Sequence, residues 1–234
     1  TAAAIVGAVD PAKVVDPLSG ANSAERAWPY LLAGYESGYM YYGASLDMEI
    51  KATLACNQAV ALADPIVAGG ADTVAPTVWL PQRLPWNPGG FGGGALWGWP
   101  AGEAAAMSSS FHVWTFAHDV SGLARVQLLV REDSDGVNDT ATVANETYAG
   151  GAGVGAWTAL DMTRRVMPAG EPWDMGSIDL TVLPTRIADQ YWLQLTGYSE
   201  VLLDYCIEAE DNQGNIKRTP IQHVYVGAGG STGG

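Results

Sequence analysis

Apolar and polar side chains alternate most regularly near the end of the chain, in residues 205–210 and again in 221–226. The stretch between these two runs is polar and contains Asn212, Gly214 and Asn215. A period of two residues on both sides of a Gly/Asn-containing connection is typical of an antiparallel hairpin. We therefore predict a hairpin that closes a β-sandwich.

The same alternation, or a short apolar run bounded by turn residues, recurs in 111–119, 125–131, 157–166, 177–183 and 190–196. We expect the first two of these segments to form a hairpin and 132–156 to be a long acidic, glycine-rich excursion. Six or seven short strands in about 120 residues are typical of an immunoglobulin- or fibronectin-like antiparallel β-sandwich. Trp114 and Trp192 lie inside predicted strands, so we expect them in the core.

The N-terminal part has a helical pattern instead. Asn22 with Glu25 three residues later predicts an N-cap with its capping-box partner, followed by a helix from 23 to about 35 that Pro29 bends. Ser45 predicts the cap of a second helix, from 46 to about 63, which Pro65 ends or kinks. Two helices alone bury little surface, so we expect this segment to pack on something else.

Residues 69–110 are dense in Pro, Gly and Trp, and their bulky aromatic residues distinguish them from a flexible linker. We expect a connecting belt pinned to a surface. The predicted organisation is a helical segment (1–68), a Trp/Pro/Gly-rich connecting belt (69–110), an immunoglobulin-like β-sandwich (111–227) and a Gly-rich tail (228–234). The fold class is thus mainly β with a helical N-terminal segment.

Composition narrows the choice of partners. The chain has 234 residues, is 48% hydrophobic and carries a formal net charge of −14. That charge repels phosphate backbones and anionic lipids, so neither nucleic acid nor a membrane surface is an expected partner. It suits a secreted, extracellular protein. The chain begins at Thr1 with no signal sequence, so we expect a processed product or part of a longer protein. Cys56 and Cys206 are either paired in a disulfide or two buried free thiols.

Several stretches, taken in their order along the chain, resemble one known family. Residues 73–83 (TVAPTVWLPQR) and 85–89 (PWNPG) are similar to the segment that follows the catalytic region in secreted glycoside hydrolase family 57 proteins of the amylopullulanase type. Residues 39–43 and 47–63 resemble the end of the helical region before it. Residues 111–119, 145–151 and the closing hairpin resemble the appended β-sandwich module. The resemblance covers most of 25–227, and residues 1–21 and the tail match nothing.

The resemblance implies a C-terminal region without its catalytic barrel, because neither catalytic carboxylate of that family matches a position here. We therefore expect no enzyme activity, and a carbohydrate-associated module that binds polysaccharide (α-glucan) or packs on an upstream catalytic chain. The alternative is an extracellular structural subunit that self-assembles into a homo-oligomeric filament, tube or surface layer. Two features motivate that alternative: the helices bury too little surface to form a core of their own, and the long aromatic belt could dock on a neighbouring copy. An active hydrolase is the third reading.

Tryptophans are the candidate carbohydrate-binding residues, because an indole face covers the C–H surface of a pyranose ring and its N–H donates. Trp97 and Trp99, flanked by glycines, are the first candidates, with Trp86 and Trp79 after them. The competing interpretation is that most of these residues pack in the core or between domains.

One acidic loop predicts a calcium site. Asp133, Asp135, Asn138 and Asp139 place oxygen ligands closely around a glycine, as calcium loops require. An acidic surface turn is the competing interpretation, and no other cofactor is expected. Glu208 and Glu210 are expected to be surface charges rather than a catalytic pair. The histidines, His112, His118 and His223, are expected at ordinary strand positions.

Overall fold

The computed structural model describes residues 9–16, 20–35, 46–67, 72–84, 108–133, 147–151, 153–167 and 184–226. The chain divides into two compact units, one formed by 1–74 with 167–188 and the other by 75–166 with 189–234. The predicted boundaries differ from this division in two places. Residues 167–188 group with the helices although they lie within the predicted sandwich range, and the predicted belt is divided between the two units.

The helical unit contains α2 (Pro11–Val15), α3 (Ser23–Gly34) and α5 (Leu46–Val67). The predicted capping box is confirmed, because Asn22 Oδ1 accepts the Glu25 amide at 2.9 Å and Glu25 Oε2 accepts the Asn22 amide at 2.7 Å. Glu25 Oε1 also accepts the amide of Asp10 at 2.9 Å, which joins α2 to the start of α3. These amides of Asp10 and Asn22 lower the pKa of Glu25 below its usual value of 4.5.

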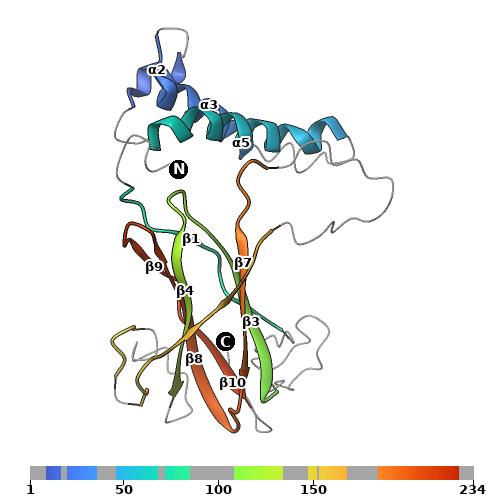
Figure 1. Cartoon of the computed structure of the whole chain (residues 1–234), viewed down its shortest axis with the longest axis vertical. Coiled ribbons are helices and arrows are strands. Elements are labelled where there is room, and N and C mark those ends of the chain that lie inside the picture. Colours follow the sequence, from blue (N-terminus) through green and yellow to red (C-terminus); the bar gives the residue numbers. More distant parts are fainter. Residues whose placement is uncertain are drawn as a thin grey trace, which may run out of the picture. The chain divides into compact units, whose positions relative to one another are not determined.

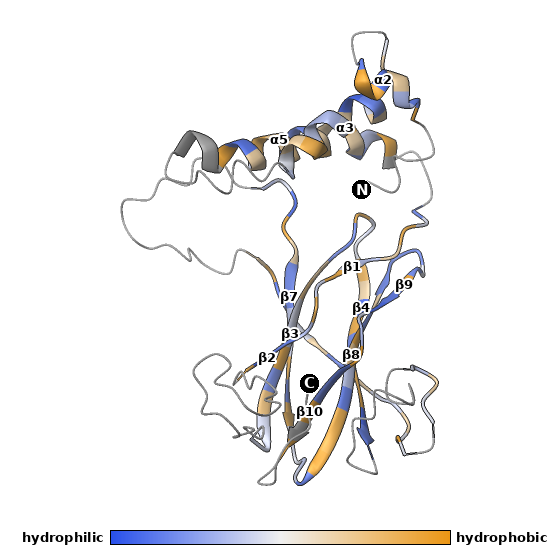
Figure 2. Cartoon of the chain, turned by 180° about the vertical axis from the view of Figure 1, so that it is seen from behind, coloured by the Kyte–Doolittle hydropathy of each residue, from blue (hydrophilic) through white to orange (hydrophobic). Residues whose placement is uncertain are grey.

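Helices α3 and α5 pack against each other through a small core of Ala24, Ala27 and Ala63. Both helices mix hydrophobic with hydrophilic residues along their length (Figure 2). Helix α5 continues through Pro65 to Val67, so the prediction that this proline ends the helix is wrong. No helix in the described part of the chain combines the length and apolar content needed to cross a membrane.

A returning segment also contacts α5. The amide of Thr185 donates to Asn57 Oδ1 at 2.6 Å, and Arg186 forms an ion pair with Asp64 at 2.7 Å. These bonds explain why Thr185 and Arg186 belong to the helical unit rather than to the sandwich.

The second unit is a sandwich of two five-stranded antiparallel sheets (Figure 1). The first sheet has the order β1-β3-β7-β6, with β2 also paired to β3, and consists of β1 (Thr77–Val78), β2 (Gln82–Leu84), β3 (Ser110–His118), β6 (Thr163–Arg165) and β7 (Asp189–Thr196). The second has the order β10-β8-β4-β5, with β9 paired to β8, and consists of β4 (Leu123–Asp133), β5 (Thr158–Asp161), β8 (Val201–Asp211), β9 (Ile216–Arg218) and β10 (Gln222–Val226).

These strand orders are those of the immunoglobulin fold, with β1, β3, β7 and β6 as the A, B, E and D strands, and β4, β8 and β10 as C, F and G. The predicted fold class is therefore confirmed. The closing hairpin is present, because β8 and β10 pair in antiparallel fashion with Gln222 opposite Tyr205. The connection between them contributes one more short strand, β9.

Three local predictions are corrected. Strands β3 and β4 do not form a hairpin, because the turn between them crosses from one sheet to the other. Residues 157–166 form two strands that separate at the buried Met162, with β5 in the second sheet and β6 in the first. The N-terminal end of the belt supplies two strands, β1 and β2, of the first sheet.

Two turns dock on each other at one end of the sandwich. The side-chain amide of Asn212 donates to Ser121 O at 2.6 Å, and its backbone amide donates to Gly122 O at 3.0 Å. Gly122 has φ +85°, and a Cβ there would lie 2.7 Å from Asn212 Nδ2. A glycine is required at this position by conformation and by space.

Candidate functional site

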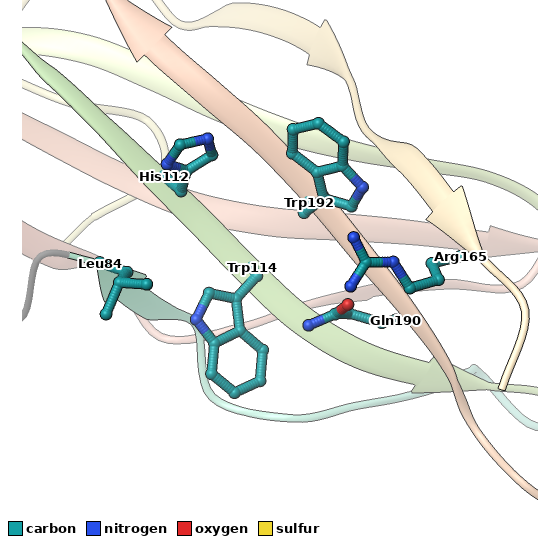
Figure 3. Close-up of a pocket in the computed structure, with 6 residues that line it drawn as sticks. All are labelled: Leu84, His112, Trp114, Arg165, Gln190 and Trp192. Carbon is teal, nitrogen blue, oxygen red and sulfur yellow. The ribbon is translucent and has the colours of Figure 1, made fainter. Parts of the chain in front are cut away.

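The outer face of the first sheet is hollowed. The hollow encloses about 490 Å³, in the range of small-ligand sites, and is lined by Leu84, His112, Trp114, Arg165, Gln190 and Trp192. These residues come from β2, β3, β6 and β7, so four adjacent strands build one surface (Figure 3).

Strand alternation determines which side chains reach this face. In β3 the buried side chains are those of Phe111, Val113, Thr115 and Ala117, so the residues between them are left for the outer face. Trp114 and Trp192 are directly opposite each other in the β3–β7 register. Gln82 on β2 and Thr163 on β6 extend the same row at its two ends. The two tryptophans are half-buried on the outer face, so the expectation that they belong to the core is wrong.

Each of the two indoles packs against a neighbouring aromatic ring. Trp192 lies against His112, with ring centroids 5.8 Å apart and the planes at 45°. Trp114 meets Phe116 edge-on, with centroids 5.6 Å apart and the planes at 85°. Each indole thus contacts its own aromatic partner in an adjacent row. Figure 3 shows both indoles and His112 on this face.

Polar side chains occupy one end of the hollow. Arg165 and Gln190 are opposite each other in the β6–β7 register. Figure 3 shows the guanidinium of Arg165 and the amide of Gln190 lying beside the two tryptophans. Neither group has a hydrogen bond or ion pair to another described residue, so their donors are available to a ligand. His112 lines the same hollow from its position in strand β3.

The predicted carbohydrate-binding tryptophans divide into two groups. Trp79 follows β1 at the edge of the same sheet, is 48% exposed, and donates its backbone amide to Phe116 O at 3.0 Å. Trp86, Trp97 and Trp99 lie outside the described residues, so their role stays a prediction. Parity identifies the pair that lines the hollow only once the structure shows that Phe111 and Val113 face inward, which places Trp114 outward.

Of the four predicted calcium ligands, the structure describes Asp133. Asp133 ends β4, is 3% exposed, and is paired in the ladder with Leu202. Asp135, Asn138 and Asp139 lie outside the described residues, so the calcium site stays a prediction.

Glu208 is buried, which corrects its assignment to the surface. Its carboxylate lies between two guanidinium groups, with Arg125 at 2.9 Å and Arg218 at 2.6 Å. Glu210 pairs with the same Arg125 at 2.6 Å. Both carboxylates are therefore engaged by arginines, as expected for a structural network and not for a pair of catalytic acids across an open cleft.

The outer face of the second sheet carries a buried charged row. Asp204 is fully buried and accepts from Arg131 Nε at 2.8 Å, and its other oxygen lies 2.7 Å from Nδ1 of His223. The guanidinium of Arg131 also donates to Thr147 O at 3.0 Å and lies 4.2 Å above the Trp157 ring. Thr147 and Trp157 thus cover the guanidinium of Arg131 on this face, which makes it part of the protein interior.

Both cysteines are free thiols, which decides between the two alternatives left open by the sequence. Cys206 is buried on β8, and burial raises the pKa of its thiol to about 12. Cys56 lies on α5 and is half-buried.

Similarity to known proteins adds one firm relation. No protein-family model matches the chain. A protein named alpha-amylase, from Niallia circulans, is 36% identical over 233 residues, which cover 92% of this chain and 18% of that protein. The chain thus spans less than a fifth of the length of the curated relative that it matches.

Among solved structures, the chain is similar to the cycloalternan-degrading enzyme from Trueperella pyogenes in complex with a covalent intermediate. The sequence identity is 11% and the TM-score is 0.32, and the match covers 51% of this chain and 14% of that chain. That structural likeness is too low to carry an argument. The sequence relation shows that the chain is homologous to part of an alpha-amylase.

Proposed function

We propose that the chain is a non-catalytic, glycan-binding part of a secreted α-glucan hydrolase, and that it holds α-glucan on the outer face of the first sheet. One observation carries the proposal. Trp114 and Trp192 stand opposite each other on a hollow of about 490 Å³ whose polar groups are not bonded to other described residues.

The chemistry of the hollow suits a sugar. Indole faces cover the apolar C–H surface of a pyranose ring, and indole N–H groups can donate to hydroxyl oxygens. Gln190 adds an amide that both donates and accepts, and Arg165 adds a fork of donors. A site with a few polar groups around apolar walls is the usual composition of a small-ligand pocket.

The homology to part of an alpha-amylase supports α-glucan as the ligand.

The non-catalytic part of the proposal is supported by the carboxylates. Glu208 and Glu210, the pair closest in sequence to a catalytic arrangement, are held by Arg125 and Arg218. The homologous relative is more than five times as long as its matched part, which leaves room for catalysis elsewhere in that protein.

Affinity electrophoresis in gels that contain soluble starch or pullulan tests the proposal. The chain should be retarded, and the Trp114→Ala/Trp192→Ala variant should migrate as it does without glucan. Loss of one stacked ring costs about 1 kcal/mol, roughly a fivefold loss of affinity. The Trp97→Ala/Trp99→Ala variant, run beside it, tests whether the belt contributes a second surface, and Trp79→Ala tests the sheet edge.

The control is a separate stability measurement. Both tryptophans of the hollow are on the outer face, so the double variant should keep the circular dichroism spectrum of the parent chain. Absence of retardation of the parent chain in starch and in pullulan would overturn the proposal. So would unchanged retardation of the folded double variant.

A further inference from the structure

Two consecutive arginines on the edge strand β6 differ in their partners. Arg164 is opposite Tyr191 and forms an ion pair with Asp189, with Nε to Oδ2 at 2.6 Å. Arg165 is opposite Gln190 and lines the hollow, and no described residue supplies it with a counter-ion. Successive strand residues point to opposite faces, so only the second guanidinium is presented to a ligand.

The described residues that line the hollow include no carboxylate. The ionisable ones among them are Arg165 and His112, and the others are neutral. The chain as a whole carries a net charge of −14, with 25 acidic residues against 11 basic ones. Five arginines of the described part of the chain form ion pairs with carboxylates, and the neighbouring Arg164 is one of them. Arg165, like Arg26, forms none with a described residue.

We propose that the hollow prefers α-glucan chains that carry an anionic substituent, a phosphate or sulfate ester or a carboxylate, over neutral chains. This inference rests on the proposed function. The sugar rings lie on the indoles of Trp114 and Trp192, and the oxygens of the substituent accept from the guanidinium of Arg165 and the amide of Gln190.

The geometry of these donors supports the preference. Guanidinium is a planar fork that donates two parallel hydrogen bonds to an oxyanion, and such charge-assisted bonds are about twice as strong as those between neutral groups. Because Arg165 and Gln190 are direct cross-strand neighbours, their donors converge on one place beside the aromatic rings. A neutral hydroxyl uses the same donors but gains no charge assistance.

Calorimetric titration of the full chain compares three ligands of equal length: neutral maltooligosaccharide, the same oligosaccharide carrying a phosphate ester, and one oxidised to a carboxylate. Affinity for the two charged ligands should exceed that for the neutral one by roughly tenfold at low salt, and this advantage should shrink as the salt concentration rises. Inorganic phosphate alone should not compete at millimolar concentration, because it lacks the rings that stack. The two charged ligands distinguish a phosphate-specific site from one that accepts any anion.

Two matched variants locate the effect. Arg165→Gln should bind all three ligands with equal affinity, whereas Arg164→Gln removes the same charge one residue away and should keep the preference. Equal affinity of the parent chain for neutral and charged ligands would overturn the inference and leave the proposed function standing. Failure of all three ligands to bind would remove the proposed function itself. A preference that survives in Arg165→Gln would also overturn the inference.

Discussion

The buried ion pair between Asp204 and Arg131 on the second sheet predicts a large loss of unfolding free energy when its acidic partner is neutralised. Asp204 has no exposed side-chain surface, and it neutralises Arg131, which is equally buried, at 2.8 Å. The substitution Asp204→Asn keeps the shape of the side chain but removes the charge. It leaves the guanidinium of Arg131 inside the protein, where it still contacts the Thr147 carbonyl and the Trp157 ring.

The expected cost follows from burial. Breaking a buried ion pair by removing one partner costs about 3–5 kcal/mol, because the remaining charge is left desolvated without compensation. A stability of about 5–15 kcal/mol is typical of a folded domain, so this loss is a large fraction of the total. Glu210→Gln is the matched control, because Glu210 pairs with Arg125 on the same sheet with side chains 29% and 38% exposed. It should cost less than about 1 kcal/mol.

Urea-induced unfolding, followed by near-ultraviolet circular dichroism, measures both losses. A further variant, Arg131→Met/Asp204→Leu, removes both charges and should recover much of the stability lost in Asp204→Asn, since apolar replacement of a buried pair is often close to neutral. Equal losses in Asp204→Asn and Glu210→Gln would refute the reasoning.

Three further predictions concern close packing and the cysteines. A Cβ at Gly34 would lie 2.6 Å from Cys56 Sγ, so Gly34→Ala should lower the melting temperature of the helical unit, and Cys56→Ala in the same chain should restore it, as scanning calorimetry would show. Gly122→Ala combines strain at φ +85° with a 2.7 Å contact to Asn212, so it should lower the free energy of unfolding in urea by about 1–3 kcal/mol. Gly214→Ala, at φ +86° in open space, should lower it by about 1 kcal/mol. Burial raises the pKa of the Cys206 thiol to about 12, so its reactive thiolate is scarce at neutral pH. Iodoacetamide should therefore modify Cys56 before Cys206. Equal modification of both cysteines in the native chain would contradict this.

The β-sandwich could be predicted because its signals are local. Alternation identified the closing hairpin strands and β3, β4 and β7 to within a few residues, and Asn22 with Glu25 identified the start of α3. The partners of the strands could not be predicted in the same way. A turn between two alternating runs fits both a hairpin and a crossing between sheets, so β3 and β4 were joined incorrectly.

The candidate site was missed because burial cannot be read from a single strand. Trp114 and Trp192 alternate with apolar neighbours on both sides, and the sequence does not say which of the two sets faces the core. Long-range pairing decides it, since Trp114 stands opposite Trp192, 78 positions later in the sequence. Glu208 was misassigned for a similar reason: its two arginine partners come from β4 and β9, and only the folded sheet brings them to one carboxylate.

Binding of α-glucan by Trp114 and Trp192 can be followed by titrating maltohexaose into the chain labelled with nitrogen-15 and recording the indole N–H signals in a heteronuclear correlation spectrum. The signals of Trp114 and Trp192 should shift together and saturate, whereas that of Trp157, whose indole N–H donates to Tyr148 O at 2.8 Å on the second sheet, should stay in place. Unchanged signals for Trp114 and Trp192 at saturating maltohexaose would contradict the account.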